Sequence, residues 1–329
     1  MVISRTPLRM SLVGGGTDLP DFFEGHGGGA VVSTAIDKYV HVIVSPRFEG
    51  DFRIGYSRTE IRERVDDIQH DLVREALRRT GLARGLDVLT LADVPGGGTG
   101  MGSSSAVTVG LLNAFHAYRG AHRSAEQLAA EACEIEIDVL GKPIGLQDQY
   151  ACAVGRFNLI EFLPGGVVKV EPIVAEPETF AALHRSLLLF YLGGARSADE
   201  LLARQGNGVR NGDNTQALIG MRELAYRTRD LLADGDVNGV GRLLHDNWML
   251  KRTVADGVTN DYIDQAYDRA MAGGALGGKL LGAGGGGFLL VHAPEHAQRN
   301  VRTALKDLRE VPFRFSASGS QIRLVEQQW

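Results

Sequence analysis

The chain has 329 residues, of which 44% are hydrophobic and 23% are charged, and this balance is typical of a globular protein with a full hydrophobic core. Its formal net charge of −5 provides no broad basic surface, which argues against a nucleic acid as the main partner. The two cysteines cannot form a disulfide framework, and neither a signal-peptide pattern nor an apolar run of about 20 residues is present. We therefore expect a cytoplasmic protein that does not contact membranes.

The first half of the chain is predicted to mix strands and helices. Alternation of apolar and polar residues predicts a strand over residues 2–12, which carries Arg9 toward a glycine turn at residues 14–16, with Asp18 just beyond it. The elements predicted after this turn are strands over residues 31–44, 86–94, 156–162 and 167–172, and helices over residues 68–80, 103–118 and 124–140.

An acidic, proline-containing stretch at residues 171–178 is the best candidate for a domain boundary. It divides the chain into an N-terminal domain of residues 1–178 and a C-terminal domain of residues 179–329. The second half is predicted to hold helices over residues 198–205, 216–233, 237–250, 260–271 and 295–308, with strands over residues 187–192 and 288–291 and at the end of the chain.

A glycine-rich loop followed by three serines lies between the strand predicted to end at residue 94 and the helix predicted to begin at residue 103. Glycines let backbone N–H groups surround an anion, and a helix N-terminus adds partial positive charge. Serine hydroxyls can bind phosphate oxygens or a magnesium ion, whereas a helix cap would require only one serine. The pattern therefore favours a nucleotide-phosphate loop over a flexible capped loop. The predicted binding residues are Pro95, Gly96, Gly97, Gly98, Gly100, Met101, Gly102, Ser103, Ser104 and Ser105.

Glu136 occupies an unusual position on the helix predicted over residues 124–140. At 100° per residue it falls at the centre of the apolar face, while the helix's other acidic residues in this region point the opposite way. A buried carboxylate needs a cation, which position alone leaves open as an arginine in an ion pair or a magnesium ion. The nearby glycine–serine loop favours magnesium.

Three further charged residues have the chemistry of a phosphoryl-transfer site. Asp148 lies in a predicted loop over residues 145–150, and beside a nucleotide it would suit a general base for an attacking hydroxyl. Arg9 and Lys38 would stabilise the negative charge on the transferred group. Each of these side chains, taken singly, is also typical of a solvated surface residue.

Three glycine-containing segments together resemble the GHMP kinase superfamily, in the order in which that family carries them. They are residues 5–18, 95–106 and 279–288, so the resemblance covers nearly the whole chain. It implies a kinase that uses ATP and Mg²⁺. It also implies an α+β fold, a two-domain α/β sandwich, with an N-terminal domain like ribosomal protein S5, a ferredoxin-like C-terminal domain and the site between them.

Within this superfamily, residues 14–20, 145–151, 276–290 and 319–322 are similar to D-glycero-D-manno-heptose 7-phosphate kinases. Matched position by position, the resemblance implies that Ser104 and Glu136 bind magnesium, that Asp148 is the catalytic base, and that Asp18 grips substrate hydroxyls beside Arg9. The other substrate-binding positions that it implies are Gly15, Gly16, Thr17, Gly284 and Gly285. Galactokinases carry an acidic–histidine pair where this chain has two glycines, which counts against galactose.

The leading hypothesis is ATP-dependent phosphorylation of D-glycero-D-manno-heptose 7-phosphate at its anomeric hydroxyl, giving the 1,7-bisphosphate. The phosphate already on this substrate needs cations, for which Arg196 or the pair Lys251 and Arg252 are candidates. The alternatives are a kinase for a non-phosphorylated hexose, similar to galactokinases or fucokinases, and a sensor that has lost catalysis. The expected partners are ATP and a small sugar or sugar phosphate, bound by a monomer or homodimer.

Overall fold

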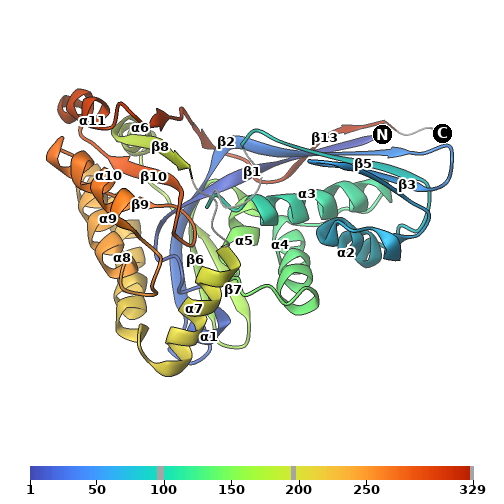
Figure 1. Ribbon diagram of the computed structural model, residues 1–329, viewed down its shortest axis with the longest axis horizontal. Helices are drawn as coiled ribbons and strands as arrows, with labels where there is room; N and C mark the ends of the chain where they lie inside the picture. The colour runs from blue at the N-terminus through green and yellow to red at the C-terminus, as the bar shows by residue number, and fades with distance from the viewer. Residues whose placement is uncertain (95–99, 194–197, 327–329) are drawn as a thin grey trace.

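The computed structural model describes residues 1–94, 100–193 and 198–326. These residues form two sheets with helices packed against them, which confirms the expected α+β fold (Figure 1). The first sheet has the strand order β13-β1-β2-β5-β3-β4, with β6, β7 and β12 joined to β2 and its neighbours. The second sheet has the order β11-β8-β10-β9.

A long antiparallel pair, β1 (Val2–Val13) and β2 (Gly29–Pro46), forms the middle of the first sheet. The first part of β2 pairs with β6 (Phe157–Leu163), and the later part pairs with β5 (Leu86–Ala92). On the other side of β1, β13 (Gln321–Val325) pairs antiparallel with the start of that strand, so that Val325 lies opposite Val2 (Figure 1). The remaining strands are β3 (Phe52–Gly55), β4 (Thr59–Arg62), β7 (Val167–Pro172) and β12 (Phe315–Ser316).

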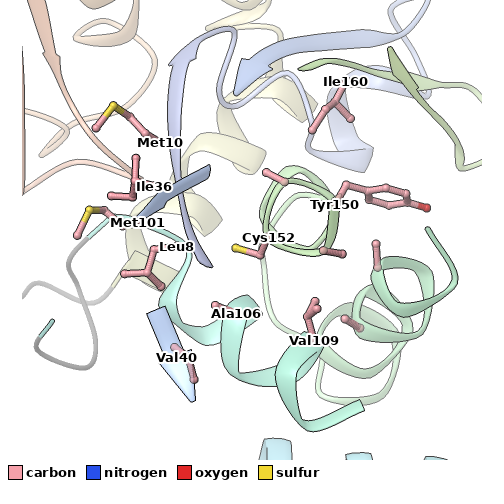
Figure 2. Packing of buried hydrophobic residues seen from close by; sticks show 14 of the residues in the cluster. Leu8, Met10, Ile36, Val40, Met101, Ala106, Val109, Tyr150, Cys152 and Ile160 are labelled. Carbon is pink, nitrogen blue, oxygen red and sulfur yellow. The ribbon is translucent and has the colours of Figure 1, made fainter. Parts of the chain in front are cut away.

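Helix α3 (Ser103–Tyr118) packs against β1 and β2, and its bounds are those predicted from the sequence. Three helices surround it: α2 (Asp71–Thr80), α4 (Ala125–Cys133) and α5 (Gln147–Val154). The core lies between these helices and the sheet, because the alternating apolar side chains of the strands point to that side. Figure 2 shows this packing around Leu8, Ile36 and Met101, all of which are fully buried.

The second sheet consists of β8 (Leu187–Gly193), β9 (Gly277–Leu280), β10 (Gly287–His292) and β11 (Arg309–Glu310). Helices α8 (Thr215–Ala233) and α9 (Val237–Lys251) both contact β1 of the first sheet, and α9 also contacts β9, so they join the two halves. The other helices are α1 (Pro20–Phe23), α6 (Pro177–Ser186), α7 (Ala198–Asn211), α10 (Asp261–Ala272) and α11 (Gln298–Ala304).

The division expected at residue 178 falls at the start of α6, between the strands of the two sheets. Strands β12 and β13 then return to the first sheet, so the last part of the chain completes the N-terminal half. Across the described ranges, no helix has both the length and the apolar composition needed to cross a bilayer.

Two local expectations about the site were wrong. Residues 147–154 form α5, so Asp148 lies in the first turn of a helix rather than in a loop. Gly141 adopts a φ of +65° that ends the preceding helix, and the short connection after it allows a new helix to begin. The preceding helix is also not α-helical to its end, because Glu134–Val139 form a π-helix.

Candidate active site

The described part of the predicted phosphate loop runs from Gly100 into α3, whereas Pro95, Gly96, Gly97 and Gly98 lie outside the described residues. Gly102 is the N-cap of α3, with a φ of +70° and no side-chain cap, so the serines that follow it do not cap the helix. A Cβ atom on Gly102 would lie 3.0 Å from Arg9 Cγ and 3.3 Å from Asp148 Oδ2. Glycine therefore allows the loop backbone to lie directly against these two side chains. Met101 anchors the loop in the core (Figure 2).

Glu136 is fully buried, as the helical periodicity predicts. Its Oε2 atom accepts hydrogen bonds from Ser104 Oγ at 3.1 Å and from Ser105 Oγ at 3.4 Å. Burial raises the pKa of Glu136, and the charge of Lys142 opposes this shift. Within the described ranges, no arginine or lysine forms an ion pair with Glu136, and Lys142 Nζ instead donates to Ser104 Oγ at 3.3 Å. Among the residues that the structure describes, the arginine ion pair that was one of the two alternatives is therefore not found.

Ser104 and Glu136 fit a magnesium site that is shared with a nucleotide. Magnesium prefers oxygen ligands and usually takes one or two carboxylates together with substrate phosphates. One hydroxyl and one carboxylate, on neighbouring helices, supply such ligands beside the N-terminus of α3. Where the chain is described, no cluster of three or more histidine, cysteine or acidic side chains could hold a metal ion by itself. This donor set suits a metal that arrives with phosphates.

Arg9 and Asp148 form a bidentate ion pair beside the start of α3. Arg9 Nε donates to Asp148 Oδ1 at 2.7 Å, and Arg9 Nη2 donates to Asp148 Oδ2 at 2.9 Å. Burial lowers the pKa of Arg9, but the Asp148 carboxylate more than offsets this effect, and the pKa is raised overall. Arg9 also donates to the backbone carbonyl of Gly100, so the phosphate loop and the predicted base share one guanidinium. The side chain of Asp148 is 25% exposed and accessible to a substrate.

Asp18 is held at the end of the glycine turn. Its carboxylate accepts hydrogen bonds from Gly16 N at 2.8 Å, from Gln147 N at 3.2 Å and from Gln147 Nε2 at 2.9 Å. Burial, followed by the charge of Asp148, raises the pKa of Asp18. Gly145 must be a glycine here, because a Cβ would lie 1.9 Å from Asp18 Oδ2. The start of α5 thus positions two carboxylates of the predicted site, those of Asp18 and Asp148.

The other predicted substrate-binding residues lie in two turns, the glycine turn after β1 and the turn between β9 and β10. Thr17 Oγ1 donates to Gly14 O at 2.8 Å and stabilises the turn itself. Gly15 lies beside Ser11 Oγ and the Gln147 amide. Gly284 and Gly285 form the turn between β9 and β10, where Gly285 N donates to Val258 O at 2.9 Å.

The basic residues predicted to bind phosphate groups lie in different places in the structure. Lys38 lies on β2, with its Nζ atom 3.6 Å from Asp37 Oδ1. Arg252 forms an ion pair with Asp264 at 3.0 Å, while Lys251 is buried near Arg9, and Arg196 lies outside the described residues.

Sequence reasoning did not single out Gln147, Lys279, Gln205 or Asn247. Lys279 is 1% exposed, and its Nζ donates to Ser11 O at 2.8 Å, which ties β9 to β1. The available signal was a lone lysine between glycines and leucines in a segment that reads as a strand. Gln205 and Asn247 are buried near the glycine turn, and the sequence carries no comparable signal for them.

Comparison with known proteins agrees with this geometry. Residues 69–156 match the GHMP kinases N terminal domain and residues 228–310 match the GHMP kinases C terminal domain, together more than half of the chain. A D-glycero-alpha-D-manno-heptose 7-phosphate kinase of Campylobacter jejuni is 28% identical over 92% of each chain. A mevalonate kinase of Thermococcus onnurineus is 29% identical, over 78% of this chain and 73% of that protein.

Among solved structures, a D-glycero-D-manno-heptose 1-phosphate kinase from Bacteroides thetaiotaomicron superposes with a TM-score of 0.81 at 25% identity. The match covers 99% of this chain and 100% of that one. The resemblance that the three glycine-containing segments indicate is confirmed. The chain belongs to the GHMP kinase family, and it is a phosphotransferase whose acceptor is an alcohol group.

Proposed function

We propose that the chain is an ATP-dependent sugar kinase that phosphorylates D-glycero-D-manno-heptose 7-phosphate at its anomeric hydroxyl. The observation that carries the proposal is the contact of Asp148, bound by Arg9, with Gly102 at the start of α3. A base, a cation and a helix N-terminus meet there, with Asp18 nearby. The similarity to the heptose kinases of Campylobacter jejuni and Bacteroides thetaiotaomicron supports a heptose as the acceptor.

The nucleotide binds through the phosphate loop in this proposal. The N-terminus of α3 carries the partial positive charge of the helix dipole, which attracts phosphate oxygens. Ser104 and Glu136 are the residues that would hold Mg²⁺. When bound, Mg²⁺ neutralises the charge that develops on the phosphate oxygens.

Asp148 receives the proton in the transfer step. The oxygen of the acceptor hydroxyl forms a bond to the γ-phosphorus of ATP, the bond from that phosphorus to the oxygen of ADP breaks, and the hydroxyl proton passes to the Asp148 carboxylate. Each carboxylate oxygen of Asp148 accepts one hydrogen bond from Arg9 and retains a further lone pair for this proton. Arg9 therefore orients the base without blocking it.

A set of buried polar atoms around the glycine turn supports a polyol as the acceptor. Four of them have no hydrogen-bond partner within the part of the chain that the structure describes: Ser11 Oγ, Gln147 Oε1, Gln205 Nε2 and Asn247 Nδ2. They surround Gly14, Gly15 and Gly16, next to the Asp18 carboxylate. Because buried polar groups nearly always have partners, these atoms are available to a ligand with several donors and acceptors. A sugar has such groups on successive carbons.

An acceptor panel tests the proposal. ADP release from Mg·ATP is measured with D-glycero-D-manno-heptose 7-phosphate, the unphosphorylated heptose, galactose, fucose and mevalonate, and phosphorus NMR identifies the phosphorylated carbon. We expect the heptose 7-phosphate to give the highest kcat/KM and the 1,7-bisphosphate as product. A higher kcat/KM for a free hexose would show that the hexose, and not the heptose 7-phosphate, is the substrate. The absence of ADP release with every acceptor would favour a sensor instead.

A further inference from the structure

Lys251, the last residue of α9, is a buried amine at the active site. It is 5% exposed, although lysine is rarely buried without a charged partner. Its Nζ atom donates to the backbone carbonyl of Gly282, in the turn after β9. An ammonium has three N–H donors, and this hydrogen bond is the one that the amine makes among the described residues. Donors therefore remain for a ligand.

The position of Gly282 places Lys251 beside the phosphate loop. A Cβ atom on Gly282 would lie 2.2 Å from the Cα atom of Gly100, so the two glycine backbones are in direct contact. Arg9 donates to the carbonyl of Gly100, and Lys251 donates to that of Gly282. Two basic side chains, one from each half of the chain, thus bind neighbouring glycines where the two loops meet.

Among the described residues, the charged groups that face Lys251 are Arg9, Asp18, Asp148 and Lys279. Burial, and then the charge of Arg9, lowers the pKa of Lys251 to about 8, while the two carboxylates oppose this shift. Arg9 is already bound to both oxygens of Asp148. A phosphate anion placed between the two loops would stabilise the charged form of Lys251.

The other buried lysine has a different position. Lys279 Nζ donates to Ser11 O at 2.8 Å, and this bond ties β9 to β1 rather than reaching the loop contact. Burial, followed by the charges of Lys251 and Arg9, lowers the pKa of Lys279 well below its ordinary value. Of the two lysines, Lys251 is therefore the one placed to bind the phosphate groups of the nucleotide.

We propose that Lys251 is a further catalytic residue, whose ammonium binds the non-bridging oxygens of the phosphoryl group during its transfer from ATP. The acceptor oxygen bonds to phosphorus, the bond to ADP breaks, and the acceptor proton goes to Asp148, so Lys251 keeps its own protons throughout. Electrostatic stabilisation of this kind acts on charge that develops in the transition state. The proposal rests on the phosphoryl transfer proposed above but not on the identity of the sugar.

Replacing Lys251 by methionine tests the role, because methionine retains an unbranched side chain without the charge. Arg242, in the same helix, is an exposed basic residue and supplies the matched control Arg242→Met. We expect kcat to fall by about 100- to 1,000-fold in Lys251→Met, with a small change in the KM for ATP, and to stay at the wild-type value in Arg242→Met.

The pH profile separates a catalytic charge from a structural contact. We expect the kcat/KM of the wild type to decline above about pH 8, where the amine of the free enzyme loses its proton. Lys251→Met should lack that decline, and a lysine that serves only to hold Gly282 would not produce it. Wild-type kcat in the variant, or the same alkaline decline in both proteins, would overturn the proposal.

A binding measurement tests the same role without an acceptor. In the presence of Mg²⁺, ADP with tetrafluoroaluminate mimics the phosphoryl group in transit, and calorimetry compares its affinity with that of ADP alone. We expect the wild type to bind the fluoroaluminate complex more tightly than ADP, and Lys251→Met to lose most of this difference. An unchanged gain in the variant would contradict the proposal. This affinity does not depend on which sugar is the acceptor. The experiment can therefore contradict the role of Lys251 without contradicting the proposed substrate, and the acceptor panel can do the reverse.

Discussion

Two carboxylates of the active site, Glu136 and Asp148, are stabilised in opposite ways. Asp148 is 25% exposed and already has its cation, the Arg9 guanidinium, at 2.7 and 2.9 Å. Glu136 is fully buried and accepts hydrogen bonds from two neutral hydroxyls. Taking a carboxylate out of water is costly unless a cation compensates for it. This difference is consistent with the two proposed roles, a base for Asp148 and a metal ligand for Glu136.

The largest effect in this comparison is expected from Asp148→Asn. The amide cannot act as a base, so we expect kcat to fall by roughly two to four orders of magnitude while Mg·ATP still binds. ADP release with saturating acceptor measures the first quantity, and calorimetry with a non-hydrolysable ATP analogue measures the second. Asp307→Asn, which removes a carboxylate from a surface ion pair with Arg269, is the control and should retain wild-type activity. Turnover that is unchanged in Asp148→Asn would rule out the assigned base.

Glu136→Gln is expected to act on the metal rather than on the proton. Glutamine has nearly the same shape but no charge, so we expect the affinity for the Mg²⁺ complex of an ATP analogue to fall by about 10- to 100-fold. Binding of the analogue without Mg²⁺ should change little, and titration calorimetry at several Mg²⁺ concentrations separates the two. Glu134→Gln is the matched control, because Glu134 lies in the same π-helix and binds Arg79 at 2.8 Å. Equal loss with and without Mg²⁺ would contradict a metal-binding role.

The same contrast shows how much of the site could be predicted from the sequence. Burial of Glu136 follows from the apolar periodicity of its helix, and the start of α3 at Ser103 follows from the glycine–serine pattern. The π-helix around Glu136 could not be predicted, because π-helices are rare and the apolar periodicity of these residues fits an ordinary α-helix. The helix beginning at Gln147 was missed because a loop was expected to continue after the break at Gly141.

The ion pair of Arg9 with Asp148 and the place of Lys251 were also beyond prediction from sequence patterns. Arg9 and Asp148 are 139 residues apart in the chain, and Lys251 reaches them only because α9 packs against both β1 and β9. Such contacts are set by tertiary packing, which local periodicity does not encode. A resemblance to a family can indicate which residues share a site, but not the partner that each one has there.

The smallest expected effect concerns stability, and it extends the comparison to the buried amine of Lys251. The pKa of Lys251 is about 8 in the folded protein, against an ordinary value of 10.5. Below pH 8 the folded protein must bury the charged amine, which costs on the order of 3 kcal/mol relative to an ordinary lysine. Methionine removes this cost and loses one hydrogen bond to Gly282, worth about 1 kcal/mol. We therefore expect Lys251→Met to raise the Tm by a few degrees at pH 7, although it lowers activity.

The pH dependence of that gain follows from proton binding. Between pH 8 and 10.5, the unfolded wild type retains a proton on Lys251 that the folded state has released, so the contribution of this group to the free energy of unfolding rises with pH. The Tm advantage of Lys251→Met should therefore be full below pH 8 and shrink as the pH approaches 10.5. Scanning calorimetry of both proteins without ligand across this range measures it, with Arg242→Met as the control. A Tm difference that stays constant with pH would show that Lys251 does not change its charge in this range, and a lower Tm at pH 7 would show that the amine stabilises the fold.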